Sequence, residues 1–453
     1  MNSTERQYIR CVNKILVIGA GRSSLYLIEY LHLYAQSHSY QILVCDQNTS
    51  AIEHSLSHIT GIQYLQLSIQ NESAIEPYIQ SAQVVVSLLP AFLHIQVAKL
   101  CLKHKTHLAT ASYISQEMKA LDAEVKQHDL IFLNEMGLDP GIDHMSAMHL
   151  FDQIKQKGGK ITGFKSYCGG LVADEDDGDN PWRYKFSWNP RNVILAAQGG
   201  EALYLQDHQQ KALTYQAVFK SIQLIEVPGY GLLEAYANRD SISYKTLYGL
   251  DDVADLLRGT FRKPGYCKAW STLIDLGLTD TNKIYAFAPN SNLRDFYQQV
   301  ANWSIQSEMD LLNFVHGDEI LCKQLLYIGC LSDQPLPILQ GCAADILEAI
   351  LVQKWALRAT DKDLVVMLHD VAYTLHGKAY HHYSSLVLKG EDAHKTAMAK
   401  TVGLPLAIGV KLILEKAFQE RGVIAPMCQS IYEPVLKELS SLGIVFKDTH
   451  SEA

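Results

Sequence analysis

The sequence is short of charged residues, which make up 19% of its 453 positions, while 48% are apolar. Average proteins carry about 25% charged residues, so this chain can bury a sizeable core and is not a disordered polymer. Lysine and arginine number 39 against 48 aspartates and glutamates, which gives a formal net charge of −9. This mild acidity excludes a broadly basic nucleic-acid binder, although it permits a local basic pocket for an acidic small molecule.

The nine cysteines form no CxxC pair, so the sequence contains neither a zinc ribbon nor a thioredoxin-type motif. Cysteines scattered through a long chain are typical of reduced thiols, and we expect a cytoplasmic protein. The polar N-terminus lacks the apolar segment and cleavage site of a signal peptide. The most apolar stretch, Thr401–Leu414, contains Pro405 and Lys411 and is too short for a bilayer, so it predicts a buried helix. We expect neither a membrane nor a nucleic acid as a partner.

The first part of the chain alternates between strand-like and helical segments. Apolar, β-rich runs fall at Lys14–Ile18, Gln41–Cys45, Ile62–Leu67, Val84–Leu88 and Leu130–Leu133, with a weaker one at His107–Ala109. Helical patterns between them include Ser24–Tyr34, Ala91–His104 and Ser115–Gln127. Strands that alternate regularly with helices indicate βαβ units and a parallel sheet buried on both faces. We therefore predict an α/β fold with a doubly wound parallel sheet over residues 1–138.

The pattern changes after Gly137, where Pro140 disfavours helix in the residue before it. Residues 139–392 mix helices and strands without the βα rhythm, which predicts an α+β domain with a small helical insertion near residues 265–335. The expected helices are His144–Gln156, Met309–Val315 and Gly317–Ile328. The expected strands are Lys160–Cys168, Asp363–Leu368, Ala372–Leu375 and Ser385–Leu388, with a strand-like alternation of Tyr184, Phe186 and Trp188. We expect residues 393–453 to complete the first domain with helices at Ala393–Lys400, Leu404–Glu420 and Tyr432–Leu442.

A glycine-rich turn follows the first predicted strand and opens the first predicted helix. Gly19, Gly21 and Ser24 give it the form GxGxxS, a variant of the GxGxxG fingerprint that also contains Arg22 and Ser23. Gly19 permits the tight turn, Gly21 lets the backbone approach a pyrophosphate, and Ser24 is small enough for the helix–strand contact. The order of strand, turn and helix predicts a dinucleotide site, with a plain strand–helix turn as the alternative.

Asp46 closes the second predicted strand. A carboxylate at this position accepts hydrogen bonds from the ribose hydroxyls and repels a 2′-phosphate, so Asp46 favours NAD over NADP. A solvated turn residue is the alternative. The segment from Ser87 to Pro90 ends another strand on the expected cofactor side, or is ordinary core before a helix.

Longer strings occur further along the chain: Thr110–Ser115 (TASYIS), Asn134–His144 (NEMGLDPGIDH), Ser166–Leu171 (SYCGGL), Tyr184–Trp188 (YKFSW), Asn238–Ser241 (NRDS), Arg258–Arg262 (RGTFR) and Thr401–Pro405 (TVGLP). Together they closely resemble the saccharopine reductase family, the glutamate-forming saccharopine dehydrogenases. The likeness runs from the glycine turn to the C-terminal helices, and it is weakest around Asp280–Leu336.

The resemblance implies a Rossmann domain, an α+β domain for substrate binding and dimerisation, and a small helical domain, and hence a homodimer. It also implies a reversible oxidoreductase reaction. Glutamate and 2-aminoadipate 6-semialdehyde condense to an imine, and NAD(P)H reduces the imine to saccharopine. The fungal members resemble NADP users with an arginine after the second strand, whereas this chain has Asp46. We therefore expect NAD, with NADP as the alternative.

The resemblance places Asp139, Tyr113 and Cys168 near the reacting carbon, with Asp139 as electrostatic partner or proton acceptor for the substrate amine. It implies hydrogen-bonding roles for the other two. The expected cofactor contacts are Gly19, Gly21, Arg22, Ser23, Ser24, Asp46, Ser87, Leu88, Leu89, Pro90, Thr110 and Ala111. The expected substrate contacts are Ser112, Gly169, Gly170, Phe186, Ser187, Arg239, Thr260 and Arg262, in which the arginines would bind carboxylates bidentately.

These residues also have structural interpretations. Asp139 can cap a helix, Cys168 can be a small buried hydrophobe, and Tyr113 can be a half-buried ring. The arginines can form ion pairs, and the acidic run Asp174–Asp179 is either a solvated loop or a lid over a cationic substrate group. The histidines at 381 and 382 have no acidic or cysteine partner at a ligand spacing, so we expect no metal site.

Two other functions stay open. A carboxynorspermidine-type imine reductase acts on a polyamine, which the acidic run would suit, and a catalytically silent NAD-binding scaffold would keep only the fold. The arginines and the CGG and RGTFR strings favour an amino-acid substrate. The presence of Tyr113, Asp139, Cys168 and Arg239 together argues against a silent scaffold.

Overall fold

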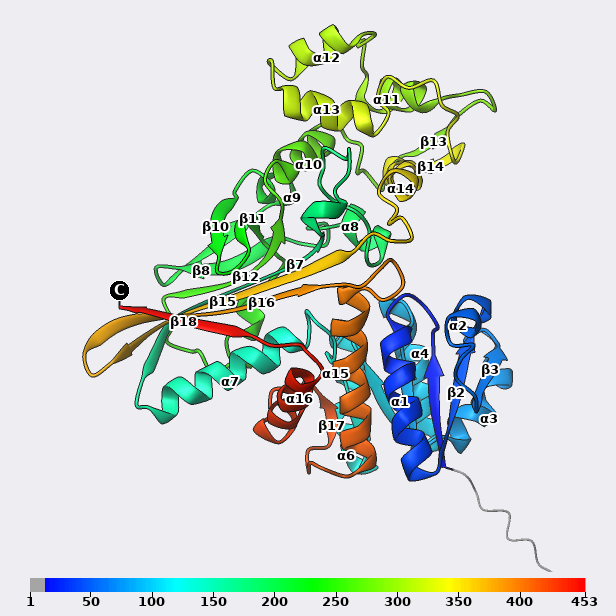
Figure 1. Cartoon of the computed structure of the whole chain (residues 1–453), viewed down its shortest axis with the longest axis vertical. Helices are drawn as coiled ribbons and strands as arrows, with labels where there is room; N and C mark the ends of the chain where they lie inside the picture. The colour runs from blue at the N-terminus through cyan, green and yellow to red at the C-terminus, as the bar shows by residue number, and fades with distance from the viewer. Residues whose placement is uncertain (1–12, 453) are drawn as a thin grey trace, which may run out of the picture. The chain divides into compact units, whose positions relative to one another are not determined.

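The computed structural model describes residues 13–452, which divide into two compact units (Figure 1). The first unit combines the chain up to His149 with Ala399–Gly443, and the second combines Leu150–Met398 with the segment from Ile444. The polar N-terminal segment, for which we expect no signal peptide, lies outside the described residues. None of the eight described cysteines forms a disulfide bond.

The first unit contains the predicted parallel sheet. Its strand order is β3-β2-β1-β4-β5-β6-β17, and every ladder in it is parallel. The order reverses between β1 and β4, which in doubly wound folds places the ligand crevice at the carboxyl ends of these strands. The strands are β1 (Asn13–Ile18), β2 (Tyr40–Asp46), β3 (Ile62–Gln66), β4 (Val84–Ser87), β5 (His107–Thr110), β6 (Ile131–Leu133) and β17 (Gly422–Ile424).

Helices cover both faces of this sheet. One face packs against α3, α4, α5 and α6 through a core that includes Leu16, Ile75 and Val97. The predicted helix Ser115–Gln127 is broken at Leu121 into α5 and α6. The helices of this part are α1 (Ser24–His38), α2 (Ser50–Ser55), α3 (Glu72–Ser81), α4 (His94–His104), α5 (Gln116–Ala120), α6 (Asp122–Gln127), α7 (Ile142–Gln156), α15 (Ala397–Leu414) and α16 (Gln429–Ser441).

Helix α15 runs unbroken from Ala397 to Leu414, whereas the expected helices Ala393–Lys400 and Leu404–Glu420 left a gap between Lys400 and Leu404. It lies beside α1 in Figure 1, and a Cβ at Gly403 would be only 2.9 Å from the carbonyl oxygen of Ser23. A Cβ at Gly409 would similarly meet Leu133 of β6, so small residues let α15 approach its neighbours. This helix has the length and hydropathy of a membrane span, but 78% of it is buried, as predicted for Thr401–Leu414.

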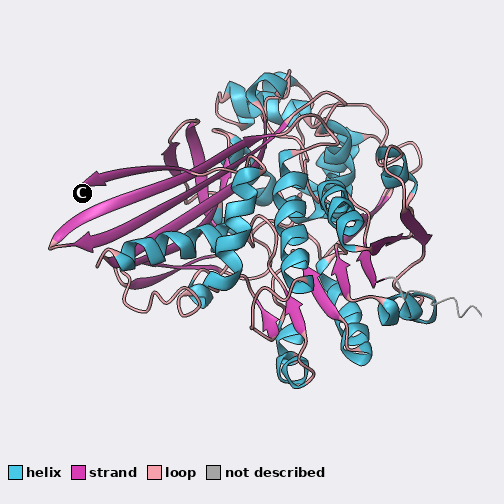
Figure 2. Ribbon diagram, turned by 60° about the horizontal axis from the view of Figure 1, so that its bottom comes forward, coloured by secondary structure: helices cyan, strands magenta, loops and turns pink. Residues whose placement is uncertain are grey.

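The second unit is built on a mixed sheet of nine strands (Figure 2). Its main order is β10-β11-β12-β7-β15-β16-β18, and β8 joins β9 to β12. The predicted strands Asp363–Leu368 and Ala372–Leu375 are one continuous strand, β15. The strands are β7 (Lys160–Val172), β8 (Ala202–Gln206), β9 (Gln209–Leu213), β10 (Gln223–Val227), β11 (Gly231–Ala237), β12 (Asp255–Arg262), β15 (Asp363–Leu375), β16 (Lys378–Lys389) and β18 (Lys447–Glu452).

The predicted helical insertion is present in the second unit, together with the small ribbon of β13 (Ile284–Ala286) and β14 (Gln340–Cys342). The expected strand at Tyr184–Trp188 is wrong, because this segment is an irregular loop. Its aromatic rings pack instead into a cluster with Trp182 and Trp355. The helices are α8 (Pro190–Ile194), α9 (Tyr215–Val218), α10 (Tyr266–Asp275), α11 (Leu293–Ala301), α12 (Glu308–Phe314), α13 (Glu319–Tyr327) and α14 (Ala343–Lys354).

The end of the chain is shared between the two units. We expected residues 393–453 to complete the first domain, and of these Ala399–Gly443 belong to the first unit. The last strand, β18, pairs antiparallel with β16 and extends the sheet of the second unit. Its six residues are all exposed, so the strand was not signalled by hydrophobic alternation.

Candidate functional site

The glycine turn leaves an open cradle before α1. Gly19 has φ +103°, and a Cβ there would lie 2.9 Å from the carbonyl carbon of Leu88, so only glycine fits. A Cβ at Gly21 would meet no described atom within 4 Å. Ser23, the N-cap residue, makes no side-chain hydrogen bond to the first turn of α1, and the Ser24 N–H donates to the Gly21 carbonyl at 3.0 Å. The cradle therefore fits a pyrophosphate at a helix N-terminus.

Asp46 is fixed at the rim of this cradle. Its Oδ2 accepts a hydrogen bond from the Ala20 N–H at 2.7 Å, and its Oδ1 accepts one from the Asn48 N–H at 3.0 Å. Ser24 is buried, and its hydroxyl donates to the Gly21 carbonyl at 2.7 Å. The other predicted cofactor contacts follow the carboxyl ends of β1, β4 and β5 at the same sheet edge: Arg22, Ser23, Ser87, Leu88, Leu89, Pro90, Thr110 and Ala111.

A buried histidine that the sequence did not single out joins two of these strand ends. His94, the first residue of α4, lies 2.8 Å through Nδ1 from the Ser87 hydroxyl and 2.8 Å through Nε2 from the Ser112 hydroxyl. The Thr110 hydroxyl lies 3.3 Å from the same Nε2. Burial lowers the pKa of His94 to about 4, so the imidazole is neutral at pH 7. Only the position of His94 shortly after a strand end could have suggested this role.

Tyr113 and Asp139, which we predicted as catalytic neighbours, are brought together. The Tyr113 hydroxyl donates to Asp139 Oδ1 at 2.8 Å. Both residues are half-buried. Asp139 does not cap the next helix, because α7 begins at Ile142. The carboxylate is therefore held by a phenol at the end of the sheet rather than by a helix terminus.

Glu135 forms hydrogen bonds with the backbone on both sides of Tyr113. Its N–H donates to the carbonyl of Ser112 at 3.1 Å, and its Oε1 accepts from the N–H of Ile114 at 3.0 Å. Its other oxygen, Oε2, is 3.0 Å from Nε2 of His144, and both side chains are buried. The string NEMGLDPGIDH contained both residues, but nothing in its spacing indicated that they would meet.

Asp143 is a second carboxylate beside His144. Its Oδ2 lies 3.5 Å from Nδ1 of His144, and its Oδ1 accepts a hydrogen bond from the Gly141 N–H at 2.6 Å. The imidazole of His144 therefore sits between two buried carboxylates. This cluster fixes the loop that carries Asp139.

The second unit holds the remaining predicted residues. Cys168 lies within β7, 8% exposed, with Thr260 of β12 opposite it on one side and Met367 of β15 on the other. A Cβ at Gly169 would lie 2.8 Å from Cβ of Phe261, so a larger residue there would push the neighbouring strand away. Cys168 is thus a buried strand residue next to a position that only glycine fills.

Gly170 and Ser187 lie close together in the same unit. A Cβ at Gly170 would be 3.6 Å from the Ser187 hydroxyl oxygen and 2.6 Å from Cε of Met398. Ser187 is buried, and within residues 13–452 its hydroxyl has no hydrogen-bond partner. Such a hydroxyl costs free energy unless a ligand or water satisfies it, which fits the predicted substrate contact. Phe186, by contrast, is buried against Trp355 at a ring distance of 5.3 Å.

The two predicted arginines have different environments. Arg262 is 3% exposed, and its guanidinium lies 5.2 Å from the ring centroids of both Tyr184 and Tyr266 and 5.8 Å from that of Tyr236. A cation enclosed by aromatic faces is stabilised by cation–π attraction, so Arg262 holds the aromatic cluster together. No ion pair between Arg262 and a carboxylate occurs in the described part of the chain.

Arg239 is exposed and has φ +43°, a left-handed conformation that is rare for a residue with a side chain. Its side chain forms no ion pair within residues 13–452. The following residue, Asp240, turns the chain by accepting hydrogen bonds from the N–H groups of Ile242 and Ser243 at 2.8 and 3.1 Å. Arg239 is therefore the predicted arginine whose guanidinium can reach an external carboxylate.

The acidic run Asp174–Asp179 is largely exposed, as expected for a solvated loop, but most of its carboxylates are also paired with cations of the protein. Lys263, which is buried, pairs with Asp174 at 2.6 Å and with Asp177 at 2.9 Å, and Arg183 pairs with the same two carboxylates. Glu175 pairs with Lys389 at 2.6 Å. The run is thus an ion-pair network with the protein's own cations, and it offers little free negative charge to a cationic substrate.

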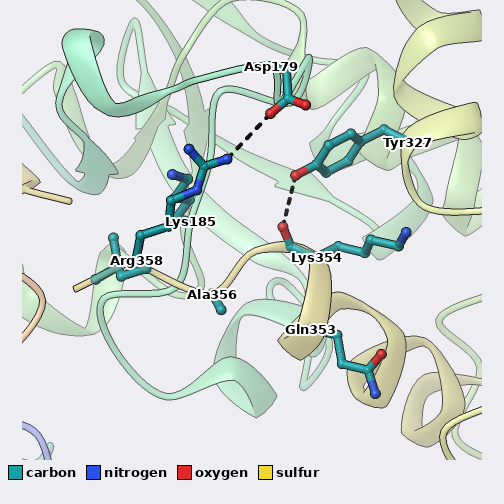
Figure 3. A pocket seen from close by; sticks show the side chains of 8 residues that line it. Asp179, Lys185, Tyr327, Gln353, Lys354, Ala356 and Arg358 are labelled. Carbon is teal, nitrogen blue, oxygen red and sulfur yellow. Dashed lines mark hydrogen bonds and ion pairs between the residues drawn. The ribbon is translucent and has the colours of Figure 1, made fainter. Parts of the chain in front are cut away.

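A polar cavity of about 380 Å³ lies beside this run, as Figure 3 shows. Arg358 extends toward Asp179 at 3.6 Å, and the Tyr327 hydroxyl donates to the backbone carbonyl of Lys354 at 3.0 Å. Lys185 pairs with Asp361 at 2.6 Å. None of the predicted site residues lines this cavity.

The two neighbouring histidines of β16 contact one carboxylate each. His381 lies 2.6 Å from Asp370, and His382 lies 3.3 Å from Asp448. Among residues 13–452 there is no group of three or more histidine, cysteine, aspartate or glutamate side chains that could hold a metal ion.

Comparison with known proteins assigns the family. Residues 15–133 match the family model described as the saccharopine dehydrogenase NADP binding domain, and residues 137–444 match the saccharopine dehydrogenase C-terminal domain. The chain belongs to the saccharopine dehydrogenase family. This confirms the resemblance seen in the sequence strings and assigns the cradle around Gly19 to an NAD(P)-binding domain.

Two relatives and one solved structure illustrate this family. Mitochondrial alpha-aminoadipic semialdehyde synthase of Mus musculus is 33% identical over 445 residues, covering 96% of this chain and 47% of that protein. The chain thus spans about half the length of such relatives. Saccharopine dehydrogenase (NADP+, L-glutamate-forming) of Saccharomyces cerevisiae is 32% identical over 416 residues, covering 88% of this chain and 92% of the yeast protein.

The structure of apo saccharopine dehydrogenase (L-Glu forming) from Saccharomyces cerevisiae has the same fold. It matches with a TM-score of 0.87 and 29% identity, covering 97% of this chain and all of that one (100%). The predicted α/β fold with a Rossmann sheet and a second mixed domain is thereby confirmed.

Proposed function

We propose that this saccharopine dehydrogenase family member is an NAD(P)-dependent oxidoreductase that acts on the secondary amine of saccharopine. The overall reaction takes saccharopine, water and NAD(P)+ to L-glutamate, 2-aminoadipate 6-semialdehyde and NAD(P)H plus a proton, and it is reversible. The observation that carries the proposal is the match along 92% of the glutamate-forming yeast enzyme. The hydrogen-bonded pair of Tyr113 and Asp139 at the carboxyl edge of the sheet supports it.

The residues of the first unit fit a dinucleotide. Gly19 and Gly21 leave the space before α1 open, and the partial positive charge at the N-terminus of this helix favours a pyrophosphate there. Asp46 is oriented to accept hydrogen bonds from a ribose, and we propose that it makes NAD the preferred cofactor. When bound, the nicotinamide ring accepts or supplies the hydride.

The protein's own residues must accept and return the protons of the reacting substrate nitrogen. Oxidation of the C–N bond to an imine removes one hydrogen from the amine as a proton, and hydrolysis then adds water and returns a proton to the departing glutamate nitrogen. Asp139 is the proposed acceptor of the first proton, and the Tyr113 hydroxyl stabilises its carboxylate by donating to Oδ1. Glu135 keeps the backbone on both sides of Tyr113 in place for this contact.

The three carboxylates of saccharopine require cationic partners. We propose Arg239 as one of them, because it is exposed and its guanidinium is not engaged in an ion pair within the described residues. Cys168, Gly169, Gly170, Ser187 and Thr260 are proposed as neutral substrate contacts. Arg262 and Phe186 are proposed to act on the substrate only through the packing of the aromatic cluster, since both are buried.

One assay tests the function directly. The purified chain is mixed with saccharopine and NAD+ or NADP+, and reduced cofactor is followed by absorbance, with carboxynorspermidine as the competing substrate. We expect turnover with saccharopine and none above background with carboxynorspermidine, because the carboxylates of Asp174–Asp179 are already paired with lysine and arginine. Preference for the polyamine would reverse the assignment, and an active wild type with an inactive Asp139→Asn variant excludes a silent scaffold.

Two further properties are proposed with the function. We propose that the protein is a homodimer, which sedimentation equilibrium on the purified chain tests. We also propose a cytoplasmic location, based on its scattered cysteines, and cell fractionation tests it.

A further inference from the structure

His94 lies at the point where the first sheet is expected to bind its ligand. Ser87 ends β4, Thr110 ends β5, and the two residues are directly opposite each other in adjacent parallel strands. The imidazole contacts both hydroxyls and also that of Ser112, just beyond β5. His94 is 4% exposed, so the imidazole meets these hydroxyls away from bulk water.

A neutral imidazole has one N–H and one bare nitrogen, so it accepts one hydrogen bond and donates one. Three hydroxyl groups surround it, and each carries a hydrogen that needs an acceptor. His94 can therefore accept from only one of Ser87, Thr110 and Ser112. The hydrogens of the other two hydroxyls must be directed elsewhere.

Distance separates the two buried hydroxyls, because that of Ser87 lies 2.8 Å from Nδ1 and that of Thr110 lies 3.3 Å from Nε2. Ser87 is fully buried, and among the described residues His94 Nδ1 is the one hydrogen-bond partner of its hydroxyl, at 2.8 Å. If Nδ1 carried the proton, the Ser87 hydrogen would have no acceptor, which is costly for a buried group. Nδ1 is therefore bare, and Nε2 carries the hydrogen and donates to Ser112 at 2.8 Å, with a longer contact to Thr110 at 3.3 Å.

We propose that His94 is a positioning residue that holds the Ser112 hydroxyl as a hydrogen-bond donor toward an acceptor oxygen of the bound ligand. Because Ser112 already accepts from Nε2, its own hydrogen is free to point away from the ring, and Ser112 is half-buried rather than enclosed. The ligand atom is a carboxylate or carboxamide oxygen, supplied by the amino-acid substrate or by the nicotinamide. The inference rests on the proposed function, because that function supplies the substrate and the cofactor as the two candidate ligands.

The first test reads the tautomer without any substrate. Nitrogen-15 NMR of the ligand-free protein labelled at histidine reports which ring nitrogen carries the proton, and a His94→Asn sample identifies the signal among the 18 histidines. We expect the Nε2–H tautomer at pH 7. An Nδ1–H tautomer would overturn the inference even if the enzyme turns over saccharopine.

The second test compares two substitutions that place a side-chain amide at different distances from the backbone. Glutamine places its amide nitrogen near the position of Nε2 and asparagine near that of Nδ1, so only His94→Gln can still donate to Ser112. We expect His94→Asn and Ser112→Ala to lower kcat/KM for saccharopine by about tenfold or more, and His94→Gln by less than about threefold. The control is His104→Asn at the other end of α4, which pairs with Glu76 at 2.7 Å and should leave kcat/KM unchanged.

The dissociation constant of NAD(P)H separates the two sources of the acceptor oxygen. If Ser112→Ala raises KM for saccharopine alone, the acceptor is a substrate carboxylate, and if it raises the NAD(P)H dissociation constant, the acceptor is the carboxamide. If neither value changes, Ser112 is not a donor to a ligand and the inference fails. A wild type with no saccharopine turnover would defeat the proposed function only, because the tautomer and the NAD(P)H titrations can still be measured.

Discussion

Asp46 offers the sharpest test of cofactor choice, because a nearly isosteric substitution removes its negative charge. In Asp46→Asn the side-chain oxygen can still accept the hydrogen bond that now joins Oδ2 to the Ala20 N–H at 2.7 Å. The amide nitrogen then takes the place of the oxygen that accepts from the Asn48 N–H at 3.0 Å, so the substitution removes the negative charge together with one backbone hydrogen bond. Gln47→Glu, one residue further along the same exposed turn, is the matched control for added charge nearby.

The size of the effect follows from Coulomb's law. A carboxylate that accepts a hydrogen bond from the ribose 2′-hydroxyl of NAD would lie about 5 Å from the phosphate that NADP carries on the same oxygen. Two negative unit charges at this separation repel each other by about 3 kcal/mol at an effective dielectric constant of about 20. Asp46 is half-buried, and salt screens part of the repulsion. A net preference of about 1.5–3 kcal/mol remains, which corresponds to roughly ten- to hundredfold tighter binding of NADH than of NADPH.

The assay is a titration of the purified protein with NADH and NADPH, followed by quenching of intrinsic fluorescence or by calorimetry. We expect the wild type to favour NADH by this factor and Asp46→Asn to bring the two dissociation constants within about threefold of each other. Equal affinities in the wild type, or an unchanged ratio in the variant, would refute the electrostatic argument. The second outcome would mean that the ribose lies away from Asp46.

Three further predictions follow from single contacts. Asp139→Asn should lower kcat by about a hundredfold and flatten one limb of the pH–rate profile, with unchanged NADH affinity; a profile like that of the wild type would remove its proton-accepting role. Arg239→Ala should raise KM for saccharopine by about tenfold or more without changing the cofactor KM, and an unaltered substrate KM would exclude it from the binding site. Burial raises the pKa of Asp363 to about 6, against about 3.9 in an unfolded chain, so the folded state binds this proton more tightly. The free energy of unfolding should gain up to about 3 kcal/mol from Asp363 as the pH falls from about 6 to about 4, and urea midpoints should show this gain in the wild type but not in Asp363→Asn.

The first unit was largely predictable because each of its strands is a short apolar run next to a helix. Strand β17 was missed because Gly422–Ile424 is too short to show a pattern, and its partner β6 is remote in the sequence. The two helices Ala393–Lys400 and Leu404–Glu420 were expected to be separate, but α15 is continuous because Gly403, a weak helix former, packs closely against α1. Local propensity fails where distant segments supply the stabilisation.

The aromatic loop shows the same limit in the second unit. The alternation of Tyr184, Phe186 and Trp188 is typical of a half-buried strand, but the rings of Tyr184 and Phe186 both pack against Trp355. The alternation of aromatic and other residues in this loop therefore reflects the packing of its rings into the aromatic cluster and not the geometry of a strand. The buried cation Arg262 belongs to the same cluster, and its burial could not be read from the string RGTFR.

Backbone strain separates the residues that the fold needs from those that the site needs. Ser39 and Lys105 have positive φ because they end α1 and α4, where the left-handed conformation is the usual way to stop a helix. Glu135 and Arg239 also have positive φ, at 58° and 43°, but neither follows a helix. Glycine or asparagine would adopt this conformation at lower cost, so the strain points to a contribution of the side chains at these two positions. For Glu135 it is the carboxylate that holds the backbone next to Tyr113, and for Arg239 an exposed guanidinium, which is the role that the proposed substrate requires.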